Sequence, residues 1–539
     1  MKGICERSAR WREARRIASR YRREEDGSLI AFSLFIFVVM LMFGGIAVDL
    51  MVYENKRTHI QNSTDSAVLA AANLNQTVDP KMVVQDHLAK VGIAVNPDDI
   101  VVREIGTAPV ITGRQVSVQV SGQYNTMLMN LVGVEHLRYG AMSEAEESVN
   151  DIEVSLVLDV SGSMDDNGKL GKMQKAAKDF VDNILLGADD DRVSLSLVPY
   201  ATQVSAGPEL FALMNTSNTH NFAHCVDFDA QDFRTTEIDH TRTLTQTMQF
   251  DPWRNYRYGQ GLRYEVCRTE SYFEITPWSN NATALKDQID AFEAEGNTSI
   301  DVAVKWGAAL LDPTMNAQLN GLIAHPGVQI DTAFAVRPHL YSYPDALKFI
   351  VVMTDGINTD QPYIRSNWRT GASPYYRHPV TNDIYMERQE PGDRDRDGRN
   401  NEAWYNVSDR RWQNNPFNNG NAGVRLSWPE AWASMTMSWR AYADYHQTYD
   451  ADDYYDALYD PRGWISDTAK DARLDDICDA AKAQGVVIFT IGFEVTDHSA
   501  NVMRDCASTP NHFYRVEGLD IEYAFASIAN QINQLKLTQ

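Results

Sequence analysis

The first strong pattern along the chain is an uninterrupted apolar run near its N-terminus. Leu29 to Val48 reads LIAFSLFIFVVMLMFGGIAV and contains no charged residue. At about 1.5 Å of helical rise per residue, this run spans roughly 30 Å, the thickness of the hydrocarbon core of a bilayer. No other stretch approaches this length and apolarity. The sequence therefore predicts a single transmembrane helix at residues 29–48.

Charge is distributed unevenly around this run. The chain carries a formal net charge of −24, yet residues 1–28 hold nine basic and five acidic side chains, which leaves −28 for the remainder. Basic flanks stay cytoplasmic, so we expect a cytoplasmic tail at residues 1–28, a span in the inner (cytoplasmic) membrane, and a bulk that faces the periplasm. A secretory signal peptide is the competing interpretation. Its apolar core is shorter, and Asp49-Leu50-Met51 does not resemble a cleavage site.

Helical sequence continues beyond the span. No proline or glycine occurs between Asp49 and Asn75, so one helix is expected from about Gly27 to Asn75. The region that follows has alternating β-branched positions, which predict strands at 96–105, 113–124 and 136–147. Residues 49–150 are therefore predicted to be an extended helix and a small α+β spacer.

The span and its continuation resemble a known family. GSLIAFSLFIFVVMLMFGGIAVDLMVYENKRTHIQNSTDSAVLAAANL is similar to the N-terminal segment of TadE/TadG-type pilus-assembly proteins, through Gly27, Asp49, Gln61, Asp65 and the alanine-rich run at 67–72. The resemblance covers about a tenth of the chain. It implies protein partners from the pilus or secretion machinery.

Prepilin processing is not expected here. Type IV prepilins are cut after a glycine, and the fifth residue of the mature chain is usually Glu. After Gly27 the fifth residue is Phe32, and no acid lies within the span. We therefore expect an uncut anchor.

From Asp151 onward, short apolar runs alternate with amphipathic helical segments. The apolar runs are IEVSLVLDV, DRVSLSLVPY, ALKFIVVMTDG, VVIFTIGFEV and HFYRVEG. Such alternation predicts a doubly wound, Rossmann-like, mostly parallel α/β sheet over residues 151–535. Two stretches rich in aromatic residues, Asn, Asp and Arg break this rhythm, and we expect long insertions at about 201–295 and 360–468.

Oxygen-bearing side chains gather where the strands of this sheet are expected to end. DVSGSM follows the first strand, NTSID opens a helix, and TDG ends a later buried strand. Doubly wound sheets bind ligands at the carboxyl ends of their strands, and hard divalent cations take oxygen ligands. We therefore expect one divalent-cation site, for Mg²⁺ or Mn²⁺, built from Asp159, Ser161, Ser163, Thr298 and Asp355.

These three motifs resemble the metal-ion-dependent adhesion site (MIDAS) of von Willebrand factor A domains, in order and in spacing relative to strands and helices. The resemblance implies that Ser161 and Ser163 bind the ion directly and that Thr298 supplies a further hydroxyl, directly or through water. It also implies that Asp159 and Asp355 act largely through bound water. An open coordination position would then take a carboxylate from a partner protein.

Enzyme chemistry is not favoured by the same loops. They contain no His, Cys or Lys beside the expected ligands that could serve as a base or nucleophile. No GxGxxG or GKS/GKT loop follows a strand, and the acidic balance argues against nucleic acid. The sequence predicts a binding module without a small-molecule substrate, not an enzyme.

A second acidic loop lies inside the second expected insertion. Asp393, Asp395 and Asp397 alternate with arginines before a glycine, as at the start of an EF-hand calcium loop. The twelfth position is Trp404, and the nearest acid, Glu402, falls at the tenth. A shortened Ca²⁺ loop formed by these four acids is the expectation, and a solvated charged loop balanced by arginines is the alternative.

Four of the five cysteines follow the span. Cys5 is expected to be cytoplasmic and reduced, whereas the others would lie in an oxidising compartment. Three pairings are open to four cysteines, and we favour the local ones, Cys225–Cys267 and Cys478–Cys506. Buried free thiols are the alternative.

Together these patterns predict a membrane-anchored binding or scaffold protein of the tight-adherence (Flp/Tad) pilus assembly system. Two alternatives stay open. One is a surface adhesin or matrix-binding receptor that uses the same metal site, and the other is a minor pilin-like structural subunit.

Overall fold

The computed structural model describes residues 26–73, 78–107, 110–148, 151–185, 192–258, 261–392, 402–417 and 422–537. It divides into two compact units, of which the first ends at Val149 and the second runs from Asn150 to Thr538. Each unit has its own hydrophobic core, so each is described by itself.

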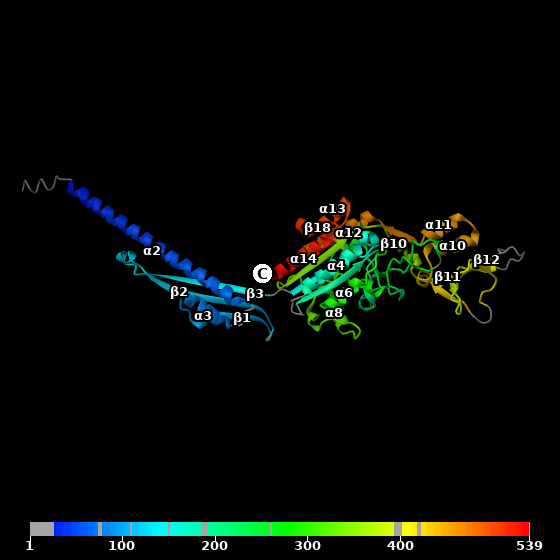
Figure 1. The fold of residues 1–539 in the computed structure, drawn as a ribbon, viewed down its shortest axis with the longest axis horizontal. Coiled ribbons are helices and arrows are strands. Elements are labelled where there is room, and N and C mark those ends of the chain that lie inside the picture. The colour runs from blue at the N-terminus through cyan, green and yellow to red at the C-terminus, as the bar shows by residue number, and fades with distance from the viewer. Residues whose placement is uncertain are drawn as a thin grey trace, which may run out of the picture. The chain divides into compact units, whose positions relative to one another are not determined.

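The first unit is a long helix that runs along a three-stranded antiparallel sheet of order β1-β2-β3 (Figure 1). Its elements are α2 (Asp26–Ala72), α3 (Pro80–Lys90), β1 (Ile100–Thr107), β2 (Val110–Asn125), the short 3₁₀ helix η2 (Met129–Val132) and β3 (His136–Ser148). The continuous helix expected from about residue 27 is thus confirmed.

The two halves of α2 have different surroundings. Its most apolar 18-residue window has a mean hydropathy of 2.7 and is only 6% buried, so the N-terminal half is not a core helix. Among the described residues, α2 alone is long and apolar enough to cross a membrane. In the C-terminal half, Ile60, Thr64, Ala67 and Ala71 recur at helical spacing and are buried. This face packs on the sheet through residues such as Val118 of β2.

The second unit is built on a six-stranded sheet of order β18-β17-β9-β4-β5-β8. Its strands are β4 (Asp151–Asp159), β5 (Val193–Tyr200), β8 (Thr276–Ser279), β9 (Ala346–Thr354), β17 (Val487–Phe493) and β18 (Phe513–Val516). All neighbouring pairs are parallel except β5 and β8. The predicted doubly wound, mostly parallel sheet is confirmed.

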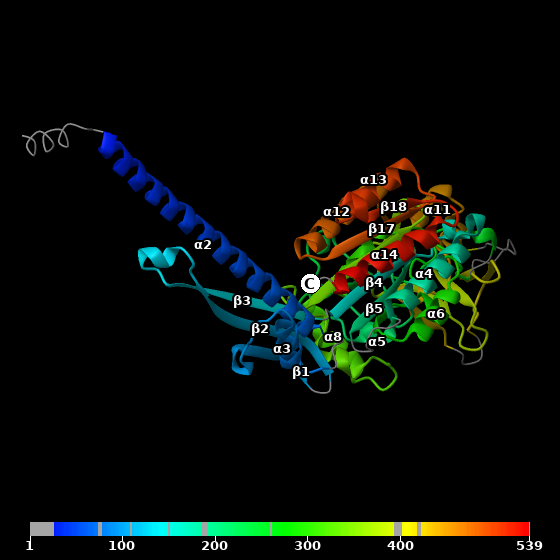
Figure 2. The same cartoon turned by 60° about the vertical axis from the view of Figure 1, so that its left-hand side comes forward.

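Helices cover both faces of this sheet. One face packs on α7 (Ile300–Ala309), α12 (Asp467–Ala483) and α13 (Asp497–Cys506), and the other on α4 (Lys169–Leu185), α6 (Ala282–Asp290) and α14 (Asp520–Leu537). Figure 2 shows α4 and α14 next to each other. Alternate residues of one strand serve opposite faces: Val157 of β4 packs on the first side, and Leu156 and Leu158 pack on the second.

The first long segment is only partly separate from the sheet. It begins with α5 (Gly207–Ala212), β6 (Val226–Asp227) and β7 (Thr245–Gln246), but β8 and α6 at its end complete the sheet edge and one helical layer. The helix α8 (Asn316–Ile323) lies between α7 and β9. Sequence patterns missed β8 because a four-residue strand containing Pro277 has little alternation.

The second long segment forms a subdomain with its own core. Strands β10 (Gln361–Ile364) and β16 (Arg462–Ile465) pair at its base. Between them lies a five-stranded antiparallel sheet of order β14-β13-β12-β11-β15, together with three helices, gathered at one end of the unit (Figure 1). These elements are β11 (Ala372–Arg377), β12 (Ile384–Gly392), β13 (Glu402–Asn406), β14 (Arg411–Gln413), β15 (Val424–Ser427), α9 (Trp428–Trp432), α10 (Met437–Thr448) and α11 (Ala451–Tyr459).

Two disulfide bonds cross-link segments of the second unit. Cys225 bonds to Cys267, and Cys478 of α12 bonds to Cys506 of α13. Both predicted pairings are confirmed. On the loop-entropy argument each bridge contributes about 2–4 kcal/mol to stability. Cys5 lies outside the described residues.

Candidate metal centre

Two strand ends bring two carboxylates together. Asp159 is the last residue of β4, and Asp355 directly follows β9. The two strands are parallel neighbours, with Leu158 opposite Met353. Because parallel strands end at the same edge of a sheet, both acids lie at its carboxyl edge, as the sequence predicts.

Asp159 is held by hydrogen bonds at both oxygens. Its Oδ1 accepts the backbone N–H of Ser161 at 2.8 Å, and its Oδ2 accepts the hydroxyl of Thr354 at 2.8 Å. The side chain is fully buried. Burial, and second the charge of Asp355, raise the pKa of Asp159 to about 7. The site therefore favours positive charge beside this pair.

The hydroxyl groups extend the cluster from the other loops. Ser161 Oγ lies 3.2 Å from Ser163 Oγ, and the Ser163 hydroxyl donates to Oδ1 of Asp355 at 2.7 Å. A Cβ atom on Gly356 would lie 3.8 Å from both Ser163 Oγ and Thr298 Oγ1. These two hydroxyls therefore border the same space, which glycine keeps open.

Backbone contacts fix the loops that carry these groups. Gly162 N–H donates to the carbonyl of Gly296 at 2.9 Å, and Glu295 N–H donates to the carbonyl of Val160 at 3.0 Å. Gly296 has a φ of +91°, and a Cβ there would lie 3.1 Å from Thr202 Oγ1. The turn before Thr298 therefore requires glycine.

A buried lysine donates hydrogen bonds to the loop that carries Thr298. Lys470 Nζ donates to the carbonyls of Thr298 and Thr359 at 2.7 and 2.8 Å, and to Ser299 Oγ at 2.6 Å. Burial lowers the pKa of Lys470 to about 8, and the charge of Asp301 opposes part of this effect. No sequence motif marks Lys470, which comes from α12, more than 170 residues after Thr298.

A second lysine lies beside the expected ligands, although the motif loops themselves contain none. Lys169 Nζ is 2.9 Å from Oδ2 of Asp355, and the lysine side chain is largely buried. Lys169 is the first residue of α4, and the 3₁₀ segment η3 (Gly162–Gly168) returns the chain to the same edge of the sheet. Inspection of the motif loops alone missed it because the contact spans 186 residues.

The donor set fits a hard divalent cation. It holds two carboxylates and three hydroxyl groups, all of them oxygen ligands, on loops at one edge of the sheet, and the hydroxyls of Ser163 and Thr298 border the space beside Gly356. Within the ranges that the structure describes, no group of three or more His, Cys, Asp or Glu side chains could hold an ion by itself. The five predicted ligand residues thus come together, and their roles as ligands stay predictions.

The match to a known family lies in the first unit. Residues 27–74 match the family described as "Putative Flp pilus-assembly TadE/G-like". This segment, which contains most of α2, is similar to that family. No well-characterised protein sequence matches the chain closely enough to count as a relative.

Solved structures offer remote likenesses. The chain is similar to the vWF domain of the type V pili tip protein Mfa5 from Porphyromonas gingivalis, at 13% identity and a TM-score of 0.31, over 72% of this chain and 98% of that one. It is also similar to the pilus adhesin SpaC from Lactobacillus rhamnosus GG, at 11% identity and a TM-score of 0.28, over 82% of this chain and 36% of that one. A third likeness is to proximal thread matrix protein 1 from the mussel byssus, whose structure has a zinc-occupied MIDAS motif. The identity is 11% and the TM-score 0.26, over 72% of this chain and 46% of that one. At these TM-scores, the likenesses say nothing about what this chain binds.

The structure gives the matched acids of the TadE/G-like segment a role. Gln61 Nε2 donates to Asp65 Oδ1 at 2.9 Å, and the hydroxyl of Ser143 on β3 donates to the same Asp65 oxygen at 2.6 Å. Asp49 is buried and accepts hydrogen bonds from the segment that joins β2 and β3. These side chains fasten α2 to the hairpin.

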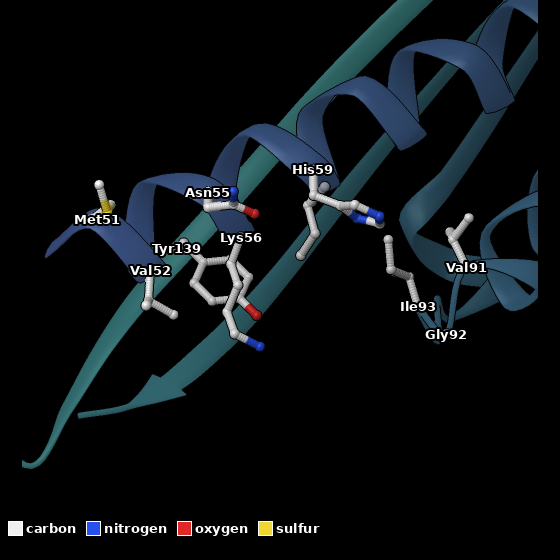
Figure 3. A pocket seen from close by; sticks show the side chains of 10 residues that line it. Met51, Val52, Asn55, Lys56, His59, Val91, Gly92, Ile93 and Tyr139 are labelled. Carbon is white, nitrogen blue, oxygen red and sulfur yellow. The ribbon is translucent and has the colours of Figure 1, made fainter. Parts of the chain in front are cut away.

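A groove of about 610 Å³ lies beside the same helix (Figure 3). Its lining includes Val52, Lys56 and His59 of α2, Ile93, and Tyr139 of β3. Figure 3 shows Tyr139 between α2 and the strand behind it. No acidic side chain lines the groove, so it offers no set of oxygen ligands for a cation.

Most of the predicted calcium loop lies outside the residues that the structure describes. Asp393, Asp395 and Asp397 lie outside the described residues, and Glu402 is the first residue of β13. Ca²⁺ binding by this loop stays a prediction.

Proposed function

We propose that this chain is a membrane-anchored binding or scaffold protein of Flp pilus assembly, not an enzyme. Its second unit faces the periplasm and holds a divalent cation, Mg²⁺ or Mn²⁺, through Asp159, Ser161, Ser163, Thr298 and Asp355. A partner protein of the pilus machinery presents a carboxylate to this ion. The TadE/G-like helix α2 anchors the chain in the inner membrane.

The observation that carries the proposal is that oxygen-bearing side chains from three loops meet at the carboxyl edge of the sheet. Asp159 is positioned by Ser161 N–H and Thr354, so its carboxylate is aligned before any ion arrives. Ser163 and Thr298 border the space from opposite loops. Such an arrangement has little value for stability alone, because two neighbouring carboxylates repel each other.

Charge supports recognition of a carboxylate. With a divalent ion bound, both acids would be ionised, so Asp159 and Asp355 would contribute −2, Lys169 would contribute +1, and the side chains would carry −1 in total. A bound divalent ion would supply an electrophilic position and a local net charge of +1. Gly356 leaves room for the incoming oxygen, and a carboxylate would be the complementary ligand.

Calorimetric titration of the full chain in detergent tests the metal step. Mg²⁺ or Mn²⁺ should bind the parent, and Asp159→Ala should weaken binding roughly a hundredfold. Ser161→Ala should weaken it more mildly. The control is Asp505→Ala, which removes an exposed acid at the end of α13. If Asp159→Ala binds the ion as tightly as the parent, the site assignment is wrong.

Cells that carry Asp159→Ala separate a scaffold from an adhesin. A scaffold variant should fail to assemble pili, whereas an adhesin variant should assemble pili that no longer adhere. Unchanged pili and adherence would reject a functional metal site.

Reporter fusions test the topology. A reporter active only in the cytoplasm should work when fused before Arg23, and one active only in the periplasm should work when fused after Gln76. The reverse pattern would overturn the proposed orientation.

A further inference from the structure

The turn that joins β2 to β3 carries an apolar tip exposed on its outer side. We call residues Met127–Val134 the hairpin tip. It contains no charged residue. Met127 and Leu131 are 75% and 74% exposed, and Leu128 and Val132 are also exposed. Exposed apolar side chains in one short segment mark a surface that meets an apolar partner.

The hairpin tip lies against the end of the predicted span. A Cβ atom on Gly45 would lie 2.7 Å from Cβ of Leu128, so only glycine permits this approach. Gly45 belongs to residues 29–48, and Asp49 follows the span directly. The tip is therefore at the level of the last helical turn inside the predicted membrane region.

Asp49 fixes the tip at this level. Its Oδ1 accepts the hydroxyl of Tyr124 at 2.8 Å and the N–H of Met127 at 3.0 Å. Its Oδ2 accepts the N–H groups of Leu128 and Met129 at 2.7 and 2.6 Å. Four donors thus balance one buried carboxylate, and three tip amides gain a strong acceptor.

The rest of the tip also pairs its backbone internally. The N–H groups of Leu131, Gly133 and Val134 donate to carbonyls within the tip, at 3.1 Å each. Backbone that enters hydrocarbon must satisfy its polar groups without water. Six of the eight tip amides thus have an acceptor, three at Asp49 and three within the tip, while the apolar side chains point outward.

We propose that the hairpin tip inserts into the periplasmic leaflet of the membrane, beside α2. The occupant of its apolar surface is the boundary between lipid headgroups and acyl chains. This choice follows from the contact with Gly45, since a surface continuous with the span meets the same solvent as the span. The inference rests on the proposed membrane anchor. It adds a second attachment point, which restrains rotation of the first unit about the axis of α2.

Depth-dependent fluorescence quenching on the full chain tests the insertion. Cys5→Ser leaves the four disulfide-bonded cysteines, and single cysteines are then introduced by Leu131→Cys, Gln119→Cys and Phe35→Cys. Gln119 is exposed on β2 opposite Met142, which is near Gln61 of α2. Along α2 it is therefore about 18 Å from Asp49. Each variant receives an environment-sensitive fluorophore in vesicles of phosphatidylethanolamine and phosphatidylglycerol.

The label at residue 131 should be quenched by lipids brominated on their acyl chains, at least fivefold more than the label at 119, and should be shielded from aqueous iodide. Iodide should quench the label at 119. A label introduced by Met127→Cys provides a second reading of the tip.

The contrary outcomes are distinguishable. If the label at 35 is quenched by brominated lipid and the label at 131 by iodide, the anchor stands and the tip proposal is wrong. If the labels at 131 and 127 are shielded from both quenchers, a protein surface covers the tip, and the lipid assignment is also wrong. If the label at 35 is not quenched by lipid, the anchor of the proposed function fails.

Discussion

The ammonium group of Lys169 lies 2.9 Å from the carboxylate of Asp355, on the side opposite the hydrogen bond from Ser163. One of the two acids of the candidate metal centre thus already has a cationic partner. A divalent ion must share Asp355 with this ammonium, so Lys169 reduces the affinity for the ion. It also adds positive charge for an incoming carboxylate.

We therefore predict that Lys169→Met tightens Mg²⁺ binding. Removal of one positive charge beside the ion is worth at least about 1.4 kcal/mol at the effective dielectric of a protein site, so Kd should fall about tenfold. Calorimetric titration of the full chain measures the change. The matched control is Lys172→Met on the same helix, whose amino group is 3.9 Å from Glu494 and not at the centre. Unchanged or weaker binding by Lys169→Met would refute this role.

The two acids should act as one unit. Asp159→Ala and Asp355→Ala should each weaken the binding of Mg²⁺ by roughly a hundredfold, because each removes a carboxylate that balances the ion. The double variant should add little to either single change, since residues that share one site couple strongly. A double-variant titration in which the two losses simply add would mean that the acids serve separate sites.

The predictable part of this centre is the part encoded locally. Asp159 ends an apolar strand, Ser161 and Ser163 follow it within four residues, and the rule that parallel strands end together also places Asp355 there. Lys470 and Lys169 could not be placed, since they reach the centre from other helices through contacts more than 170 residues long.

The subdomain between β10 and β16 was hidden for a different reason. Its core uses bulky aromatic side chains such as Tyr375, Tyr405 and Trp439 on short strands and one helix. Short strands with aromatic and polar residues on both faces lack the regular alternation from which strands are predicted. The sequence therefore indicated an insertion but not a second sheet.

Asp49→Ala should loosen the hairpin tip without unfolding the sheet. The substitution leaves the amides of Met127, Leu128 and Met129 without their carboxylate acceptor. Loss of hydrogen bonds to a charged group costs about 1.5–3 kcal/mol, so these amides should exchange roughly tenfold to a hundredfold faster. Hydrogen exchange read by mass spectrometry on the full chain measures this.

The matched variant for this experiment is Asp65→Ala. It removes an acid on the same helix that binds Ser143, far from the tip. Equal exchange at the tip in the parent and Asp49→Ala would show that Asp49 does not hold it.

Glu274 should make the second unit less stable as the pH rises. Burial, and second the charge of Glu209, raise the pKa of Glu274 from its ordinary value of 4.5 to about 7. The folded chain therefore holds this proton more tightly than the unfolded chain does. The resulting stabilisation is fully present below pH 4.5 and is lost as the pH rises through 7.

Glu274→Gln keeps the neutral shape at every pH, so its melting temperature should match that of the parent near pH 4.5 and exceed it near pH 8. The exposed Glu293→Gln should follow the parent at both values. A Glu274→Gln variant that melts with the parent at pH 8 would show that this carboxyl ionises in the folded protein without cost.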